Sequence, residues 1–491
     1  MATGVGVGGR RTRADRADRA DRAVDVVVGV VVAAFVGLRI LATSGRPITT
    51  WPDSASYFDF RWWGGVRFPV VTAPYALLGD PTAVVTAQAV VGAVAWAVAV
   101  LVAARLVPAA VPRIGVVVLG CGLGLTPPVT SWDRTLLSES FAISLTVLLV
   151  ATLLHFACRP GRAAAVAVVV AGAGWGLSRP NQSLLLVVGA GILAGLGSVR
   201  SHRRWAWPAA GVLATTALVG IALAASTSQV QEYNSGQIVV RRILGDDART
   251  AWFRARGMPG NGPALLVPPY DNVFGDPAVE LQRDPRFGPW LRGDFPSAYL
   301  RYLATHPGYT VGLPFGAEGA WGAALGGTSG YANARAVLPA GVRKVLWPDA
   351  SGSQRLLVGL GAVVLVAAAV GAVRSPGRRR ALAGAGGVLV VAGANVVLVT
   401  HTAGLEYERL LVPTATGARF ALLWLAAVTL GGATVSGPAA SAGPARRWRR
   451  RGGGRTGRGP DPAPRTPDGP APVDSPAVPG GGPGSGPPGT P

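Results

Sequence analysis

Apolar blocks close to the length of a membrane crossing recur along this chain of 491 residues and limit what it can fold into. A helix needs about 20 apolar residues to cross about 30 Å of hydrocarbon. Ten blocks meet or approach this length: 24–43, 82–104, 110–129, 135–157, 163–179, 181–198, 206–226, 354–373, 381–400 and 410–432. Only 14% of the residues are charged, whereas a soluble protein carries about 25%. We therefore predict an all-α polytopic membrane protein with about ten transmembrane helices.

The arginines between the blocks predict how the chain is oriented. If the blocks alternate in direction, the arginine-rich loops around Arg105, Arg159, Arg200 and Arg378 all lie on the side of the N-terminus. Cytoplasmic loops are enriched in Lys and Arg, so we expect a multi-pass plasma-membrane protein with both termini in the cytoplasm. The net charge of +22 comes from such short clusters and not from one continuous basic face. We therefore expect no nucleic-acid partner.

The blocks also divide the chain into segments. In order, we expect a disordered basic cytoplasmic N-terminus (1–23), transmembrane helices one to seven (24–226, with an outer loop at 44–81), an extracytoplasmic loop region (227–352), helices eight to ten (353–432) and a disordered cytoplasmic tail (433–491). The tail is rich in Pro, Gly and Arg, and such a composition cannot bury a core.

Asp53 is the first candidate for chemistry, because it lies in the first outer loop within the run Thr50-Trp51-Pro52-Asp53-Ser54. Aromatic residues beside a membrane surface can be a simple interfacial belt with a solvated acid. A carboxylate at the mouth of a cavity can instead take a proton from a hydroxyl group. The residues alone leave both interpretations open.

A second acidic group, Asp133-Arg134 followed by Glu139, lies where the third block meets the fourth. Carboxylates are favoured at the positive N-terminus of a helix, and this explains Asp133 better than Glu139. Glu139 begins an apolar block, and an ionisable group within a transmembrane segment is a candidate for function.

The remaining candidates are also expected at the outer side. They are Arg179 in the turn between two short blocks, Glu406, Glu408 and Arg409 before the last block, and His306 in the large loop. Arginine binds phosphate through two parallel hydrogen bonds, and carboxylates can transfer protons or hold a divalent ion. Together these side chains suit a phosphate-bearing lipid headgroup and a hydroxyl acceptor.

Four of these features together resemble the GT-C superfamily of integral-membrane glycosyltransferases, which includes polyprenyl- and dolichyl-phosphate-sugar-dependent mannosyltransferases. They are the loop sequence Asp53-Ser54-Ala55-Ser56-Tyr57, the run from Asp133 to Ser140, the turn Arg179-Pro180, and Glu408-Arg409 with Pro413. The resemblance covers residues 24–432, and the order and sidedness of the motifs carry more weight than any single match.

The resemblance implies a GT-C-like fold and a cell-envelope enzyme. It would move a sugar, with inversion, from a polyprenyl-phosphate donor to a hydroxyl of a glycan, lipid or protein on the extracytoplasmic face. Asp53 would be the catalytic base. The substrate-binding residues would be Asp133, Arg134, Glu139, Arg179, Glu406, Glu408, Arg409 and His306. Many relatives carry paired acids in the first loop, whereas Ser54 follows Asp53 here, so a requirement for Mg or Mn is left open.

Two other functions share the same overall pattern. A transporter or flippase for a lipid-linked glycan would place polar residues near the midplane, often with interrupted helices in both halves, and no internal repeat of that kind is visible. A non-catalytic membrane scaffold is the other alternative. The enzyme hypothesis predicts that Asp53, Glu139, Arg179 and Arg409 meet in one pocket at the outer ends of the helices.

Overall fold

The structure is a computed structural model that describes residues 8–226, 228–260, 277–316, 320–326, 334–348, 351–403 and 406–431. Within these ranges the regular secondary structure is helical, and β pairing is limited to an isolated parallel bridge between Thr49 and Thr135. The predicted all-α class is therefore confirmed. The expected tail at 433–491 lies outside the described residues.

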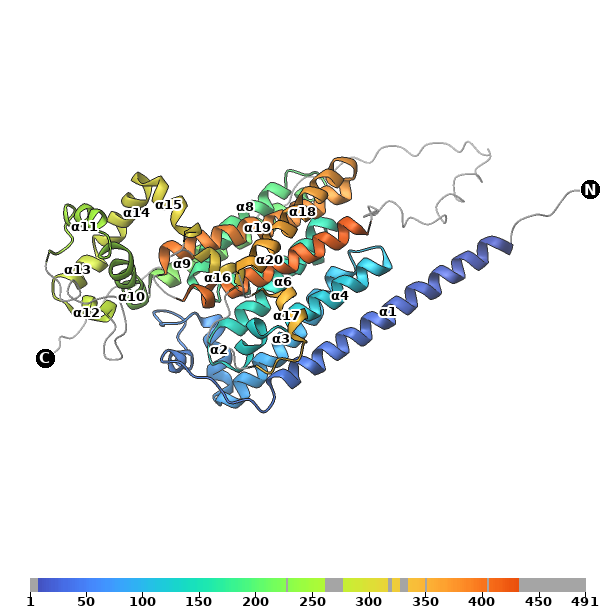
Figure 1. Cartoon of the computed structure of the whole chain (residues 1–491), viewed down its shortest axis with the longest axis horizontal. Helices are drawn as coiled ribbons and strands as arrows, with labels where there is room; N and C mark the ends of the chain where they lie inside the picture. Colours follow the sequence, from blue (N-terminus) through green and yellow to red (C-terminus); the bar gives the residue numbers. More distant parts are fainter. Residues whose placement is uncertain are drawn as a thin grey trace, which may run out of the picture. The chain divides into compact units, whose positions relative to one another are not determined.

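Seven of the described helices are long and apolar enough to cross a membrane. They are α1 (Gly8–Thr43), α3 (Pro81–Ala104), α6 (Glu139–Cys158), α9 (Arg203–Ala225), α18 (Ser351–Arg374), α19 (Pro376–Thr402) and α20 (Tyr407–Leu430) (Figure 1). The chain is therefore a multi-pass membrane protein. Helix α1 begins well before the expected first span and includes part of the segment expected at 1–23.

The third apolar block forms a bent pair of helices. Helix α4 (Ala110–Gly124) is followed by α5 (Pro127–Thr130) and the 3-10 helix η2 (Ser131–Arg134), with a bend of 58° between the two halves. The residue before a proline avoids the helical conformation, and Thr126 is extended with ψ of 143°. This pair counts as an eighth crossing if its two halves form one span.

The fifth and sixth blocks form shorter helices than expected. Helix α7 (Arg162–Gly176) has 15 residues and α8 (Pro180–Leu196) has 17, so each spans roughly 22–26 Å at 1.5 Å per residue. The break follows from Pro180, which starts α8 and leaves Arg179 extended. All ten expected positions hold a helix, but the described residues contain seven or eight full-length crossings and not ten. Since α7 and α8 are consecutive, omitting both from the count leaves the predicted sides of the later loops unchanged, whereas omitting the bent pair would reverse them.

The remaining elements lie in the two long connections. They are η1 (Ser54–Tyr57), α2 (Pro69–Leu78), α10 (Ser228–Ile238), the π-helical turn η3 (Val239–Ile243), α11 (Asp247–Arg254), α12 (Pro277–Arg283), α13 (Phe287–Arg292), α14 (Phe295–Thr305), α15 (Pro307–Gly312), η5 (Leu313–Phe315), α16 (Ala320–Gly326) and α17 (Ala340–Leu346). Helices α10 to α15 are grouped together (Figure 1), and they share a core that includes Phe253, Phe287 and Phe295. Helix α16 instead packs against α20, where Arg419 donates to the carbonyl oxygens of Ala324 and Leu325.

Two apolar cores hold the long helices together. One core includes Phe35 of α1, Trp96 of α3 and Phe420 of α20. The other joins α6, α7, α8 and α9 and includes Trp175 and Leu213. Helix α6, which begins at Glu139, contributes residues to both cores.

Candidate functional site

The first outer loop is attached to the segment that leads into α6. The backbone N–H of Thr49 donates to the carbonyl oxygen of Arg134 at 2.9 Å, and the N–H of Leu136 donates to the carbonyl oxygen of Thr49 at 3.0 Å. A parallel pairing of this kind joins segments that are distant in sequence. It brings the loop that carries Asp53 beside the N-terminus of α6.

Glu139 is a fully buried carboxylate that lies between two arginines. Its Oε1 is 2.5 Å from Nη2 of Arg179 and 2.7 Å from Nε of Arg409, and its side chain is 0% exposed. Removing a charge from water costs several kcal/mol per ion unless an opposite charge compensates it. The two guanidinium groups provide this compensation, so Glu139 lies buried as part of a charge network.

Arg409 connects Glu139 to two further acids. Its Nη2 lies 3.3 Å from Oδ2 of Asp53, and its Nη1 lies 3.1 Å from Oε2 of Glu406. Glu406 precedes α20 with a positive φ of 58°, a conformation uncommon for a residue other than glycine. The structure therefore brings together five of the predicted residues, which are Asp53, Glu139, Arg179, Glu406 and Arg409.

Arg67 completes the network at its more exposed end. Its Nη2 is 2.7 Å from Oδ2 of Asp53, its Nε donates to Oγ of Ser56 at 2.9 Å, and its guanidinium lies 4.7 Å from the centre of the Tyr57 ring. The side chain of Asp53 is 26% exposed, in contrast to the buried Glu139. Sequence reasoning missed Arg67, although its place in the same loop as Asp53 was an available signal.

We refer to Asp53, Arg67, Glu139, Arg179, Glu406 and Arg409 as the acid–arginine cluster. Its three carboxylates and three guanidinium groups give it no net formal charge. Nη1 of Arg179 has no hydrogen-bond partner among the described residues, although Arg179 is only 5% exposed. Arg179 also directly precedes the N-terminus of α8, where the helix dipole favours an anion. An anionic group could therefore be bound at Arg179.

Neighbouring side chains hold the cluster in place. Nε of Arg179 and the hydroxyl of Tyr57 donate to Oγ of Ser138, at 3.1 Å and 3.3 Å. The hydroxyl of Tyr75 donates to the carbonyl oxygen of Leu137 at 2.8 Å. These bonds fix the two residues that precede Glu139, so the position of its carboxylate is determined by the first outer loop as well as by α6.

Asp133 is not brought into the cluster. Its Oδ2 lies 3.0 Å from Nε of Arg39 and its Oδ1 lies 3.1 Å from Nη2 of Arg39, and both side chains are 0% exposed. Oγ of Ser140 donates to the same Oδ1 at 2.7 Å. Both carboxylate oxygens therefore have partners within the protein, and these partners lie outside the acid–arginine cluster. Arg39 was not among the predicted residues, because a single arginine near the end of an apolar block resembles an ordinary flanking charge.

Three other predicted residues are also not placed in the cluster. Arg134 donates from Nη2 to the carbonyl oxygen of Arg46 and so holds the first outer loop. His306 stacks on Tyr302 with 4.0 Å between ring centres, within the aromatic group of α11 to α15. The side chain of Glu408 lies outside the described part of the chain.

No metal site is visible among the residues that the structure describes, because no three His, Cys, Asp or Glu side chains lie close enough together to hold an ion. The carboxylates of the cluster face guanidinium groups instead. The sequence left open whether the protein requires Mg or Mn, and the described residues offer no set of ligands for such an ion.

Comparisons with known proteins identify no relative. No family model, no curated protein and no solved structure matches the chain.

Proposed function

We propose that this chain is a membrane glycosyltransferase that moves a sugar from a polyprenyl-phosphate donor to an acceptor hydroxyl, with inversion at the anomeric carbon. The observation that most supports this is the meeting of Asp53, Glu139, Arg179 and Arg409, which come from four distant parts of the chain. Such a reaction needs a base beside the acceptor hydroxyl and positive charge beside the departing phosphate. The cluster supplies both kinds of group within a few ångströms.

The proposed orientation follows from the arginine-rich loops. With these loops and both termini in the cytoplasm, the acid–arginine cluster lies at the extracytoplasmic ends of the helices in the plasma membrane. A donor that is anchored in the bilayer by its own lipid reaches such a site without leaving the membrane. The protein then has mainly to orient the headgroup, and proximity can contribute roughly 7–11 kcal/mol to lowering the barrier.

Each charged group has a proposed role. Arg179 and Arg409 bind the donor phosphate, and Nη1 of Arg179 is a buried donor with no hydrogen-bond partner in the described part of the protein. The acceptor oxygen forms a bond to the anomeric carbon while the bond from that carbon to the phosphate oxygen breaks. Asp53 takes the hydroxyl proton, and the lipid phosphate leaves with its negative charge compensated by the arginines.

The shared position of Arg409 links donor binding to the base. In the free protein the carboxylate of Asp53 contacts both Arg67 and Arg409. A phosphate that binds Arg409 competes for that guanidinium and reduces its effect on Asp53. The carboxylate of Asp53 is then free to accept the proton of the acceptor hydroxyl.

The test is an Asp53→Asn variant of the full chain, purified in detergent and assayed with radiolabelled polyprenyl-phosphate mannose and glucose in the presence of extracted envelope acceptors. We expect the wild type to release polyprenyl phosphate, and Asp53→Asn to lower this rate by about 10²–10⁴-fold. Asp59→Asn is the matched control, because Asp59 lies in the same loop, is 55% exposed and pairs only with Arg61 among the described ion pairs. Equal rates for wild type and Asp53→Asn would remove Asp53 from the mechanism.

The same assay separates the enzyme from the alternatives. Detergent-solubilised protein does not separate two compartments, so a transporter or flippase would give no signal in this assay. A wild type that leaves the donors intact in detergent but moves them across reconstituted vesicles would contradict the proposed enzyme and favour a flippase. A wild type that does neither would favour a scaffold.

A further inference from the structure

Six arginines and no acidic residue occur in the segment 159–226, which contains α7, α8 and α9. One of them, Arg179, belongs to the acid–arginine cluster. The other five lie at the opposite end of these helices, and they are Arg159, Arg162, Arg200, Arg203 and Arg204. This end therefore carries positive charge that no carboxylate of the same segment compensates.

Helices α7 and α9 run side by side in the same direction, and both begin at this end. A Cβ atom at Gly172 of α7 would lie 2.9 Å from Cδ2 of Leu213 of α9. Gly172 is ten residues beyond Arg162, and Leu213 is ten residues beyond Arg203. Since both helices rise by about 1.5 Å per residue, Arg162 and Arg203, the first residues of the two helices, lie at the same level.

The imidazole of His202 holds the start of α9 against the end of α6. It is fully buried, and its Nε2 lies 3.0 Å from the carbonyl oxygen of Ala157. Burial and, to a smaller extent, the guanidinium of Arg380 lower the pKa of His202. His202 is therefore an uncharged contact at neutral pH, and Arg380 of α19 adds a further positive charge close to the start of α9.

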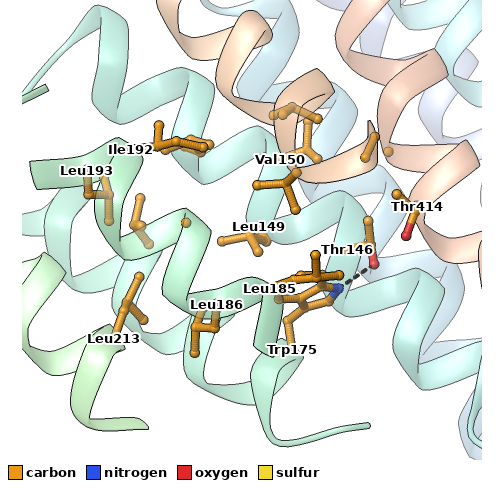
Figure 2. A pocket seen from close by; sticks show the side chains of 17 residues that line it. Thr146, Leu149, Val150, Trp175, Leu185, Leu186, Ile192, Leu193, Leu213 and Thr414 are labelled. Atoms are coloured by element: carbon orange, nitrogen blue, oxygen red, sulfur yellow. Dashed lines mark hydrogen bonds between the residues drawn. The ribbon is translucent and has the colours of Figure 1, made fainter. Parts of the chain in front are cut away.

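The guanidinium groups of Arg162 and Arg203 are exposed, and none of the hydrogen bonds or ion pairs between described residues involves them. The first turns of α7 and α9 contain no acid either. A cation is unfavourable at the N-terminus of a helix, so these arginines do not stabilise the helices that carry them. Leu186, Leu193 and Leu213 meet between the helices (Figure 2), and this apolar interior keeps the guanidinium groups on the outside.

Apolar side chains continue from these arginines along the outside of both helices. Val166 and Val170 lie about one and two turns beyond Arg162 on α7, and they are 54% and 66% exposed. Trp207 lies about one turn beyond Arg203 on α9 and is 53% exposed. Residues four apart share one face of a helix, so this surface changes from cationic to apolar within a turn. Such a surface matches an amphiphile with an anionic headgroup.

The charged ends of this part of the bundle lie closer together than the two sides of a bilayer. A Cβ atom at Gly220 of α9 would lie 3.4 Å from Cδ2 of Leu177, two residues before Arg179 of the cluster. Gly220 is 17 residues beyond Arg203, which corresponds to roughly 26 Å, whereas the hydrocarbon is about 30 Å thick. A bilayer adapts to a short apolar span by thinning, and this brings lipid phosphates toward Arg162 and Arg203.

We propose that the adjacent N-terminal ends of α7 and α9 bind an anionic phospholipid of the surrounding bilayer. Its phosphate lies between Arg162 and Arg203, and its acyl chains lie along Val166, Val170 and Trp207. Guanidinium groups bind phosphate through charge-assisted hydrogen bonds, and each arginine near an anionic membrane surface adds a preference of roughly fivefold. The lipid supplies the negative charge that the segment 159–226 lacks, and the site is independent of the proposed sugar transfer.

The test removes these charges without altering the apolar surface. The probe is phosphatidylglycerol that carries a diazirine in one acyl chain, added to the purified full-length protein in a neutral detergent, and crosslinked peptides are identified by mass spectrometry. Arg162→Gln/Arg203→Gln removes both guanidinium groups, and Arg162→Lys/Arg203→Lys keeps the charge. Arg22→Gln/Arg374→Gln is the matched control, because it removes two exposed arginines from the same end of α1 and α18, which pack mainly against α3, α4, α19 and α20.

We expect the wild type, the control and the lysine variant to be labelled on the first halves of α7 and α9, and Arg162→Gln/Arg203→Gln to be labelled about tenfold less. Unlabelled phosphatidylglycerol should compete with the probe, whereas phosphatidylcholine and inorganic phosphate should compete poorly. Equal labelling of Arg162→Gln/Arg203→Gln, or equal competition by phosphatidylcholine, would overturn the inference, because the contact would not depend on charge. Equal competition by inorganic phosphate would indicate a site for a free anion and would also overturn it. A lysine variant labelled as weakly as the glutamine variant would likewise contradict recognition by charge.

Discussion

Arg39 of α1 and Asp133 of η2, 94 residues apart in the sequence, form a fully buried, two-contact ion pair. Nη1 of Arg39 also donates to the carbonyl oxygen of Gly124, at the end of α4. Ser140, next to Glu139, binds the same carboxylate. This charge pair thus links α1 to both halves of the bent pair, α4 and η2. It also contacts Ser140, which is next to Glu139 of the acid–arginine cluster.

Removal of one partner of this pair should destabilise the protein strongly. Arg39→Met leaves Asp133 buried without its counter-charge, and breaking a buried pair in this way costs about 3–5 kcal/mol. The double variant Arg39→Met/Asp133→Leu removes both charges and should recover much of the loss. Chemical denaturation of the purified protein in detergent measures the free energy of unfolding. A double variant that is no more stable than the single one would contradict the pair as the source of the effect.

Gly92 should tolerate no larger residue. A Cβ atom at Gly92 of α3 would lie 2.5 Å from Nη2 of Arg39, and Arg39 cannot move away without losing Asp133. We expect Gly92→Ala to lower the free energy of unfolding by about 1–3 kcal/mol, as overpacking does. Gly115→Ala in α4 is the control, because its Cβ would meet nothing described within 4 Å. Since alanine favours a helix over glycine, a loss of stability in Gly115→Ala similar to that in Gly92→Ala would refute this explanation.

Within the cluster, the arginines should differ in their effect on stability. Arg179→Gln removes a guanidinium from the fully buried Glu139, and we expect a loss of about 3–5 kcal/mol. Arg67→Gln removes a counter-charge of the partly exposed Asp53 and the contacts of Arg67 with Ser56 and Tyr57. An ion pair of this exposure contributes about 0–1 kcal/mol. Thermal unfolding of the two purified variants should show a lower midpoint temperature for Arg179→Gln than for Arg67→Gln. A larger effect of Arg67→Gln would mean that burial does not control the strength of these pairs.

The stability of the N-terminus of α11 should depend on pH through the carboxyl group of Asp246. Hydrogen bonds from the backbone N–H of Arg249, and then from its guanidinium, hold the pKa of Asp246 below its ordinary value. A carboxyl group with a lowered pKa in the folded state stabilises the fold above its unfolded pKa. This stabilisation is lost as the pH falls through the folded pKa. We therefore expect faster amide hydrogen exchange in α11 only in the acidic range, below about pH 4.

Two variants check this assignment. Asp246→Ala removes the cap and should cost about 1 kcal/mol at neutral pH. Asp246→Asn keeps a side-chain acceptor but does not titrate, so its exchange in α11 should lose the acidic dependence while the helix stays protected at neutral pH. An unchanged acidic dependence in Asp246→Asn would assign the effect to another group.

The positions of the helices could be predicted from the sequence. Apolar blocks of membrane-crossing length must form helices, because their backbone polar groups have no water to bind in a bilayer. Pro127, Pro128 and Pro180 also marked where blocks three and five break. The sequence further singled out Asp53, Glu139, Arg179 and Arg409, since charge beside or within an apolar block is costly and needs a reason.

Only the tertiary structure decided which charges meet. Asp133 and Glu139 are six positions apart and were both predicted to bind substrate, yet Asp133 pairs with Arg39 and Glu139 pairs with Arg179 and Arg409. The contact of Arg67 with Asp53 also became known only from the tertiary structure. A hydropathy pattern determines that a segment is a helix, but the partner of a buried charge depends on how helices pack across distances of many residues. That packing also determines whether a pocket remains between the helices.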